Sequence, residues 1–307
     1  MIDVTLIGCG GTMPLPGRAL SALAVRCGGR VALVDCGEGT QAAARAAGVR
    51  LVKADVLCLT HYHGDHFFGV PGLLQTMANL GRTEPVRLIG PEGLNHWGRL
   101  LLALAGPLPF PVEFEELPMA EKELELPGFC GLVLTAFPLA HRVPCMGYAF
   151  RLPRAGRFLP AKALLLDVPQ SAWKLLQQGE AAVLPDGRVI LPQQVLGPAR
   201  EELKLVYATD TSPCTALETA ARNADLLIMD ATYPAQADAD KAAAYGHSTF
   251  AQTAALAVRT GAKRLWLTHY SGAVSDPTQA LAEIQDIYPG AVAGRDGLTT
   301  TLAFAGR

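Results

Sequence analysis

The chain has 307 residues, of which half are hydrophobic and 18% are charged, so it can bury a large core and is globular rather than disordered. Its formal net charge of −2 gives no overall positive field of the kind that marks nucleic-acid-binding proteins, although a local basic patch could suffice. The chain does not open with a basic segment and a long apolar one, and no apolar run reaches the length of a membrane span. We expect a cytoplasmic protein with no membrane partner.

The seven cysteines are scattered, odd in number and mostly inside apolar runs. No two of them form a CxxC pair, so neither a thiolate zinc site nor a disulfide framework is indicated. We expect reduced cysteines in the core at all of these positions: Cys9, Cys27, Cys36, Cys58, Cys130, Cys145 and Cys214.

Apolar runs and turn residues predict the elements of the first half. A strand at residues 2–8 leads to Gly8, Gly10 and Gly11, which allow a tight turn or a close backbone approach. Residues 20–26 and 30–35 flank Cys27-Gly28-Gly29, which is typical of a β-hairpin. Further strands are predicted at 56–59, 86–89, 111–117, 131–137 and 147–152, and helices at 41–47 and from Pro71 to about Leu80.

The segment from Pro153 to Arg200 has a different composition, with recurrent prolines and an Asp186-Gly187 turn signal. This texture predicts an inserted or projecting segment with one short helix around residues 171–177. It is not of low complexity and need not be disordered.

In the second half, strands are predicted at 203–208, 225–229, 265–268 and 298–304. Ser248 can cap a helix that runs to about Thr260 and stops at Gly261. A last helix is expected from Pro277 to just before Pro289-Gly290. Strands and helices mix in both halves, with histidine or aspartate at strand ends. This order favours two sheets face to face, helices outside them, and a site on one common edge.

The heptapeptide T-H-Y-H-G-D-H at residues 60–66 holds three of the seven histidines and follows the buried-strand pattern of residues 56–59. Imidazole and carboxylate suit Zn²⁺ and neighbouring first-row ions. His61 and His63, two residues apart, can point the same way from an extended start. A second ion could meet the two ligand-type residues further round the turn, Asp65 and His66. The alternative is a solvated loop that holds several histidines.

Other candidate ligands follow strand-like runs elsewhere in the chain. His141, Asp210 and His269 each come after such a run, and His247 stands just before a predicted helix. Taken singly, Asp210 could be a turn aspartate and His247 a residue of a helical N-terminal turn. His96 lacks a setting of this kind, and we interpret it as a packed or surface residue.

Together, His61-x-His63-x-Asp65-His66, His141, Asp210 and His269 resemble the signature of the metallo-β-lactamase superfamily. Within it, the chain most resembles the ribonuclease Z family of tRNA 3′-end processing endonucleases. The blocks that carry this narrower resemblance are D-C-G-E-G-T-Q at 35–41, F-G-V-P-G-L-L at 68–74, H-R-V-P-C-M-G-Y at 141–148 and G-H-S-T at 246–249. The resemblance runs from about residue 7 to about residue 272 and implies an αββα four-layer sandwich. It also implies one domain over 1–307, with residues 153–200 as an inserted arm.

The resemblance implies two zinc ions per chain, with manganese possible. One ion would be held by His61, His63 and His141, and the other by Asp65, His66 and His269. Asp210 would bridge them, because each of its two oxygens can face one cation. Asp65 would also be the general base, and His247, which is not a ligand, would donate a proton or stabilise charge on the scissile phosphate.

Three stretches depart from the family pattern. The first loop keeps Arg18 but lacks the family's asparagine, and the segment after His269 lacks its arginine and tyrosine. Residues 168–173 replace a P-P-G-P stretch of the arm. A modest phosphate-binding patch or a solvated surface would equally explain the basic residues in or beside the arm, which are Arg151, Arg154, Arg157, Lys162, Lys174, Arg188 and Arg200.

We therefore expect a zinc-dependent phosphodiesterase of the ribonuclease Z type, a homodimer whose leading substrate is the 3′ trailer of pre-tRNA. Because the substrate-contact loops differ, tRNA processing is expected to be weak compared with cleavage of a small activated phosphodiester. The main alternative is a diverged hydrolase of a small phosphodiester or another ester that does not process tRNA. A non-catalytic binding protein is a further alternative, which the complete set of ligands argues against.

Overall fold

The computed structural model describes residues 1–305. They divide into two compact units, one formed by Met1–Arg151 with the chain from Lys204 onward, and one formed by Leu152–Leu203. Over the described residues, the helices are all too short or too polar to cross a bilayer.

The first unit contains two sheets, each of seven strands among the described residues. The first sheet has the order β16-β1-β2-β3-β4-β5-β6. Neighbours from β16 to β3 are antiparallel, and those from β3 to β6 are parallel. Its strands are β1 (Ile2–Gly8), β2 (Ala22–Cys27), β3 (Arg30–Val34), β4 (Ala54–Cys58), β5 (Val86–Pro91), β6 (Val112–Leu117) and β16 (Leu298–Leu302).

The second sheet has the order β15-β14-β13-β12-β9-β8-β7. The pairs from β12 to β15 are parallel, whereas β8 is antiparallel to both of its neighbours, β7 and β9. Its strands are β7 (Lys122–Glu125), β8 (Val133–Pro138), β9 (Met146–Arg154), β12 (Arg200–Ala208), β13 (Leu226–Asp230), β14 (Leu265–Thr268) and β15 (Ala291–Ala293).

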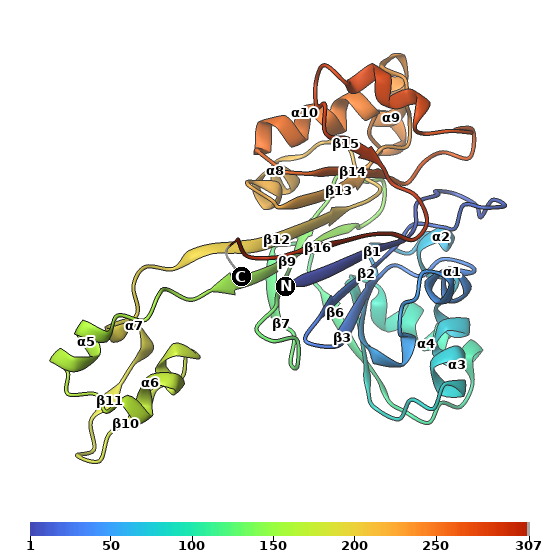
Figure 1. Ribbon diagram of the computed structural model, residues 1–307. Helices are drawn as coiled ribbons and strands as arrows, with labels where there is room; N and C mark the ends of the chain where they lie inside the picture. Colours follow the sequence, from blue (N-terminus) through green and yellow to red (C-terminus); the bar gives the residue numbers. More distant parts are fainter. Residues whose placement is uncertain (306–307) are drawn as a thin grey trace. The chain divides into compact units, whose positions relative to one another are not determined.

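Helices cover the outer faces of both sheets (Figure 1). Beside the first sheet lie α1 (Thr40–Ala46), α2 (Gly64–Phe67), α3 (Val70–Asn79) and α4 (Leu94–Ala105). Beside the second lie α8 (Thr215–Ala221), α9 (Ala239–Tyr245) and α10 (Phe250–Thr260). Short 3₁₀ helices are η1 (Leu51–Lys53), η2 (Gln236–Asp238) and η3 (Gln279–Ile284). The αββα sandwich indicated by the sequence is confirmed.

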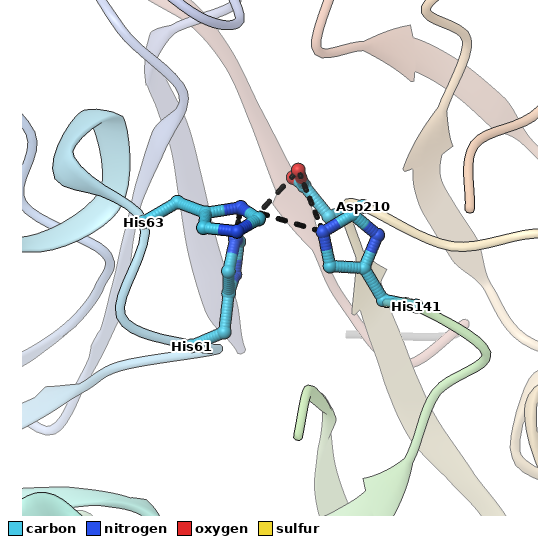
Figure 2. A group of neighbouring side chains, drawn as sticks. All are labelled: His61, His63, His141 and Asp210. Carbon is cyan, nitrogen blue, oxygen red and sulfur yellow. Dashed lines mark hydrogen bonds and ion pairs between the residues drawn. The ribbon is translucent and has the colours of Figure 1, made fainter. Parts of the chain in front are cut away.

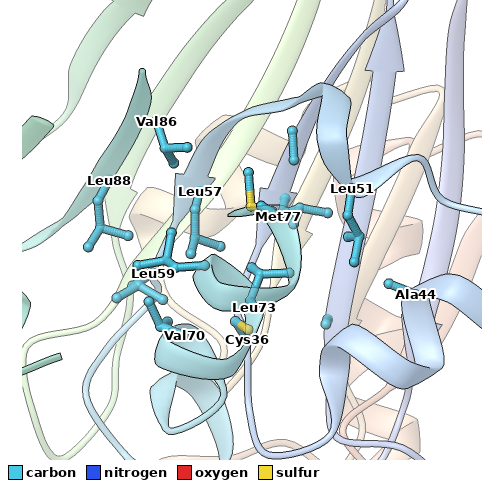
Figure 3. Packing of buried hydrophobic residues seen from close by; sticks show 14 of the residues in the cluster. Cys36, Ala44, Leu51, Leu57, Leu59, Val70, Leu73, Met77, Val86 and Leu88 are labelled. Carbon is cyan, nitrogen blue, oxygen red and sulfur yellow. The ribbon is translucent and has the colours of Figure 1, made fainter. Parts of the chain in front are cut away.

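The core between the first sheet and its helices follows from helical periodicity (Figure 3). Helix α3 buries Val70, Leu73, Leu74 and Met77, the i, i+3, i+4, i+7 spacing of one face. These side chains meet strand residues such as Leu57, which is 2% exposed. Burying one side chain of this size contributes roughly 1.5–3 kcal/mol, so the helix is held mainly by packing.

The structure confirms the hairpin predicted between β2 and β3, but the capping residue of α10 differs from the predicted one. Gly28 and Gly29 both have positive φ, 61° and 81°, as a two-residue type I′ turn requires. The prediction that Ser248 caps α10 is wrong. Thr249 is the cap, since its side chain accepts a hydrogen bond from the Gln252 N–H while the Gln252 side chain bonds back. The Ser248 hydroxyl instead donates to the Thr211 carbonyl.

Several elements were not predicted. Helix α4 was missed although its buried residues Leu94, Gly98, Leu101 and Ala105 lie on one helical face. Its exposed face also carries apolar side chains, at Trp97, Leu100 and Leu104. The helix expected from Pro277 is only the 3₁₀ helix η3. The other missed elements of this unit are β7, β15, α2, α8, α9, η1 and η2.

The cysteines are all free within the described residues, as expected. Five of them are buried, but Cys130 is exposed and Cys214 is half-buried, so the expectation of seven core cysteines is wrong at those two positions.

The second unit has its own small apolar core, built from residues such as Ala163, Leu176 and Val195. The predicted helix around residues 171–177 is α6 (Gln170–Gln177), and the Asp186-Gly187 signal forms the turn of a short hairpin, with Gly187 at φ 86°. Elements that the sequence did not predict are α5 (Pro160–Leu165), β10 (Ala182–Val183), β11 (Val189–Ile190) and α7 (Pro192–Val195).

Candidate metal centre

The ends of parallel strands bring the candidate ligands to one edge of the sandwich. In the first sheet β3 and β4 are parallel, with Val34 opposite Cys58, so Asp35 bonds to Thr60, the residue before His61, where the two strands end. The second sheet contains three neighbouring parallel strands, β12, β13 and β14. Asp210 comes shortly after the end of β12, Asp230 is the last residue of β13, and His269 directly follows β14. Because parallel strands share a C-terminal edge, these side chains converge.

A first group joins three histidines and one carboxylate, whose side chains point toward one another (Figure 2). His61 Nε2 lies 2.9 Å from His63 Nδ1, and His63 Nδ1 lies 3.4 Å from His141 Nε2. The Oδ2 atom of Asp210 is 3.7 Å from His61 Nε2 and 3.9 Å from His141 Nε2. One nitrogen of each ring therefore faces a common point.

A second group joins Asp65, His66 and His269. Asp65 Oδ2 is 3.5 Å from His66 Nε2 and 3.6 Å from His269 Nε2, and the two nitrogens are 3.3 Å apart. The backbone N–H of Thr12 donates to Asp65 Oδ2 at 2.7 Å, which fixes the carboxylate.

Asp210 belongs to both groups. Its Oδ2 faces the first group, while Oδ1 lies 3.1 Å from His66 Nε2 and 3.0 Å from His269 Nε2. This Oδ1 atom is buried and accepts no hydrogen bond within the described residues. A buried carboxylate oxygen without a donor is destabilising, and a cation on each side would satisfy the group. The nitrogen and carboxylate donors thus fit metal ions of the zinc and manganese type.

Comparisons with known proteins agree with this geometry. The family profile of the metallo-β-lactamase superfamily matches residues 16–135, and that of a related β-lactamase superfamily domain matches residues 194–270. Ribonuclease Z of Lachnoclostridium phytofermentans is 41% identical over 304 residues, and that of Agathobacter rectalis is 40% identical, with 99% of each chain covered in both cases.

The chain belongs to the ribonuclease Z family. Among solved structures, the short form of human tRNase Z has a TM-score of 0.70 and 26% identity, covering 98% of this chain and 100% of the other. YhfI from Bacillus subtilis, a metallo-β-lactamase fold protein, has a TM-score of 0.70 at 20% identity and shows the fold alone. With the histidine and aspartate cluster, family membership makes this chain a metal-dependent hydrolase of phosphodiester bonds.

Groups behind the ligands fix the orientation of four rings. In each case one ring nitrogen faces the cluster while the other contacts a fixed oxygen, which selects the tautomer. These pairs of Nδ1 and oxygen are His61 with Thr60 Oγ1 at 3.0 Å, His66 with Asp35 Oδ2 at 2.9 Å, His141 with Gly246 O at 2.9 Å and His269 with Thr232 Oγ1 at 3.0 Å.

Two buried carboxylates behind the ligands were not singled out from the sequence as site residues. Asp35 accepts hydrogen bonds from the N–H and hydroxyl of Thr60 and contacts His66. Asp230 accepts from the backbone N–H groups of Thr232 and Ser248, and its Oδ2 lies 2.8 Å from His247 Nδ1. The signal that could have found both is an aspartate at the end of a strand-like run, the setting that indicated Asp210.

The structure brings His247 to the edge of the cluster and leaves His96 on the surface. The His247 ring lies 5.3 Å from that of His269 and 5.2 Å from that of His141. The His247 side chain remains 14% exposed, so one side of it faces solvent. His247 also lies close enough to Asp210 and His269 for the three side chains to share one ion. Its position therefore allows His247 to act either as a metal ligand or as a proton donor.

Three residues at strand ends adopt left-handed backbone conformations, which are unusual for residues other than glycine. They are Asp35 at φ 62°, Asp210 at φ 51° and His269 at φ 62°. Such strain concentrates at functional sites, where the surrounding structure holds it in place.

The electrostatics of the cluster favour positive charge at its centre. Burial lowers the pKa of His61, His63 and His141, which keeps these rings in the neutral form that binds metal. Burial alone would also lower the pKa of His269, but Asp210 and Asp65 outweigh it and raise the pKa to about 9. Without a metal, protons on such rings balance the carboxylates, and a metal ion would replace them.

Proposed function

We propose that this chain is a zinc-dependent endoribonuclease that removes the 3′ trailer from pre-tRNA and binds two zinc ions. The observation that carries the proposal is the pair of ligand groups that share Asp210, one oxygen facing each. The ribonuclease Z relatives at 40–41% identity over almost the whole length support an RNA substrate. Such a substrate would place the enzyme in the cytoplasm.

The residues would divide as the family resemblance implies. His61, His63 and His141 would hold one ion; Asp65, His66 and His269 would hold the other; and Asp210 would contact both. When bound, the ions would activate a water molecule and stabilise charge on the phosphate oxygens. Manganese fits the same donors.

The protein groups then have separate tasks in hydrolysis. Asp65, held by the Thr12 N–H, accepts the proton of the attacking water. His247 donates a proton to the leaving oxygen. Asp230, 2.8 Å from His247 Nδ1, fixes the ring so that its other nitrogen is available.

Two loops that differ from the family pattern, the first loop with Arg18 and the segment after His269, should influence the affinity for tRNA. The Arg18 guanidinium donates to the carbonyls of Val274 and Ser275, at 2.6 and 3.0 Å. It therefore ties the first loop to the segment after His269, the segment that lacks the family's arginine and tyrosine. Weak tRNA processing relative to a small phosphodiester stays a prediction.

The deciding experiment compares a pre-tRNA and bis(p-nitrophenyl) phosphate as substrates of the purified chain with Zn²⁺ and with Mn²⁺. Cleavage at the 3′ end of the mature tRNA, mapped by sequencing, supports the proposal. Hydrolysis of the small ester without any cut in pre-tRNA would favour the diverged hydrolase of a small phosphodiester.

We also propose a homodimer in which residues 153–200 are an inserted arm of a single domain. The exposed stripe of α4, formed by Trp97, Leu100 and Leu104, supports a partner surface, because Leu104 is 73% and Leu100 47% exposed. Sedimentation should show a dimer that Leu104→Glu dissociates. Val258→Glu, at an exposed valine of α10, is the matched control and should leave the dimer intact.

A further inference from the structure

A group of two cations and two aromatic rings lies beside His247, outside the ligand set. The guanidinium carbon of Arg142, in the β8–β9 loop, is 5.0 Å from the ring centroid of Tyr245 at the end of α9. The ammonium of Lys241, one turn earlier on α9, is 4.9 Å from the ring centroid of Tyr233. The rings of Tyr233 and His247 have centroids 6.4 Å apart. We call these four residues the rim group.

The rim group adjoins the cluster through neighbouring positions of the chain. Arg142 directly follows His141, whose Nδ1 contacts the carbonyl of Gly246, the residue after Tyr245. The group therefore borders the position where the scissile phosphate must sit.

The charges of the rim group are free for an anion. Many arginines of this chain are neutralised by carboxylates, as Arg87 is by Glu115 and Arg259 by Glu218. Within residues 1–305, neither Arg142 nor Lys241 has an ion pair with a carboxylate, and both are exposed. Their contacts are with ring faces, which orient a cation without cancelling its charge.

The support beneath the rings is rigid. The backbone of Tyr233 is bonded on both sides to the start of α10, since its N–H donates to Ser248 O and its carbonyl accepts from the Phe250 N–H. Gly246, at φ 70°, ends α9, and its carbonyl contacts His141 Nδ1, so the backbone next to Tyr245 is held at the cluster. A side chain on a fixed support loses little freedom when it binds.

We propose that the rim group is an RNA-binding subsite, in which Arg142 and Lys241 contact phosphates flanking the scissile one and the Tyr245 and Tyr233 rings support the adjoining base. The inference rests on the proposed function and deepens it. A polynucleotide is the ligand that offers phosphates and flat rings in alternation, which matches cations set on aromatic faces. A small phosphodiester has no flanking phosphate and gains nothing from this subsite.

The test separates binding from chemistry. In Arg142→Gln, KM for pre-tRNA should rise about tenfold while kcat changes less than twofold, because a contact made equally in ground and transition states changes only KM. The kcat/KM for bis(p-nitrophenyl) phosphate should stay within about twofold of wild type. Tyr245→Ala should raise KM roughly 5- to 100-fold, the scale of base stacking on an aromatic ring, whereas Tyr245→Phe should resemble wild type. Arg99→Gln, at an exposed arginine of α4, is the control and should change neither substrate.

Equilibrium binding gives a readout that does not need cleavage. Fluorescein-labelled pre-tRNA is titrated with the full chain in an Asp65→Ala background, with and without Arg142→Gln, at several salt concentrations. Losing one phosphate contact in a single-stranded region should reduce the slope of log Kd against log salt by about 0.7.

The possible outcomes distinguish failure of the RNA-binding subsite from failure of the proposed endoribonuclease function. If wild type cleaves pre-tRNA but Arg142→Gln leaves KM and the salt slope unchanged, the subsite is wrong and the proposed function stands. Equal losses on RNA and the small ester would also overturn it, because Arg142 would then act by supporting His141. If wild type cuts no RNA, the proposed function fails. If, in addition, Arg142→Gln leaves the slope of log Kd against log salt unchanged, the RNA-binding subsite is wrong as well.

Discussion

At the scale of single residues, variants of Asp65 and His247 test whether the proposed proton donor is distinct from the metal ligands. Asp65→Ala removes a candidate ligand and the candidate base together, so turnover should be abolished. His247→Ala should lower kcat by roughly 10²–10⁴, the usual effect of losing a positioned acid, with metal content nearly unchanged. Both variants are to be assayed on the small phosphodiester, with metal measured by mass spectrometry. Loss of an ion from His247→Ala would make His247 a ligand, as its proximity to Asp210 and His269 permits.

Gly11 has a packing role that its residue type explains. A Cβ at this position would lie 2.6 Å from Cε1 and 2.8 Å from Nε2 of His269, the ring atoms that face the second group of ligands. Gly11→Ala should therefore displace His269 and lower the metal content by up to one ion per chain. Gly272→Ala is the matched control, because the nearest atom to its Cβ would be 3.9 Å away, and it should bind metal normally. Equal metal content in the two variants would mean that His269 moves without cost.

Residue chemistry also explains which site residues could be predicted. Histidines are rare in this chain, so three in one heptapeptide at a strand end point to a metal site. Asp35 and Asp230 carry only the weaker signal of a single aspartate at the end of a strand, which is also ordinary in turns. Their role depends on contacts with Thr60, His66 and His247 that arise only when strands far apart in the sequence become neighbours.

At the scale of elements, Glu115 joins neighbouring strands of the first sheet. It lies on β6 and is paired with Arg87 of β5 and with Lys122 of β7, which belongs to the second sheet. Burial alone would raise the pKa of Glu115, but bonds from Arg87 and Lys122 outweigh it and hold the pKa below its usual value. A carboxyl whose folded-state pKa is lowered adds stability above its unfolded-state pKa, and this stability is lost as the pH falls through the folded-state value.

Glu115→Gln should therefore lower the denaturation midpoint at pH 7. The difference from wild type should shrink as the pH falls through the lowered folded-state pKa of Glu115, because the carboxyl is protonated in both states only below that value. The effect is expected to be modest, because the pair is partly exposed and screened by solvent. Urea titrations in a series from pH 7 down to the lowest pH at which the chain still folds measure it. Glu113→Gln, on the same strand, is the control, and a pH-independent difference for Glu115→Gln would exclude its ionisation as the cause.

The predicted elements show where periodicity is informative. Strands such as β1 and β14 are short apolar runs bounded by turn residues, and they were placed within a few residues of their bounds. Helix α4 carries a helical pattern as well, since its buried residues Leu94, Gly98, Leu101 and Ala105 share one face, but it was overlooked. Helix α9 escaped because its Ala-rich sequence buries only Ala242 and so carries almost no hydrophobic pattern.

At the scale of the whole molecule, the cluster connects the two sheets of the sandwich. His61, His63 and His66 follow β4 in the first sheet, whereas Asp210 and His269 follow β12 and β14 in the second. Alternating strands and helices indicated two sheets with a common edge, but which strand ends meet was available only through the family resemblance. Local pattern does not determine pairings between residues as distant as His66 and His269, which contact each other across 203 positions.

Because the ligands come from both sheets, metal binding should stabilise the sandwich as a whole. An ion that binds only the folded chain adds about 2.7 kcal/mol when its free concentration is 100 times Kd, so two ions would add about twice that. Chelation should therefore lower Tm by several degrees, and Zn²⁺ should restore it, as followed by calorimetry. Asp210→Asn weakens a ligand shared by both groups, so its Tm should respond little to chelator. His96→Ala, at an exposed histidine away from the cluster, should respond as wild type does. If chelator left the wild-type Tm unchanged, then either the ions contribute nothing to folding or the groups around Asp210 do not hold them, and metal content measured on the same sample would decide which.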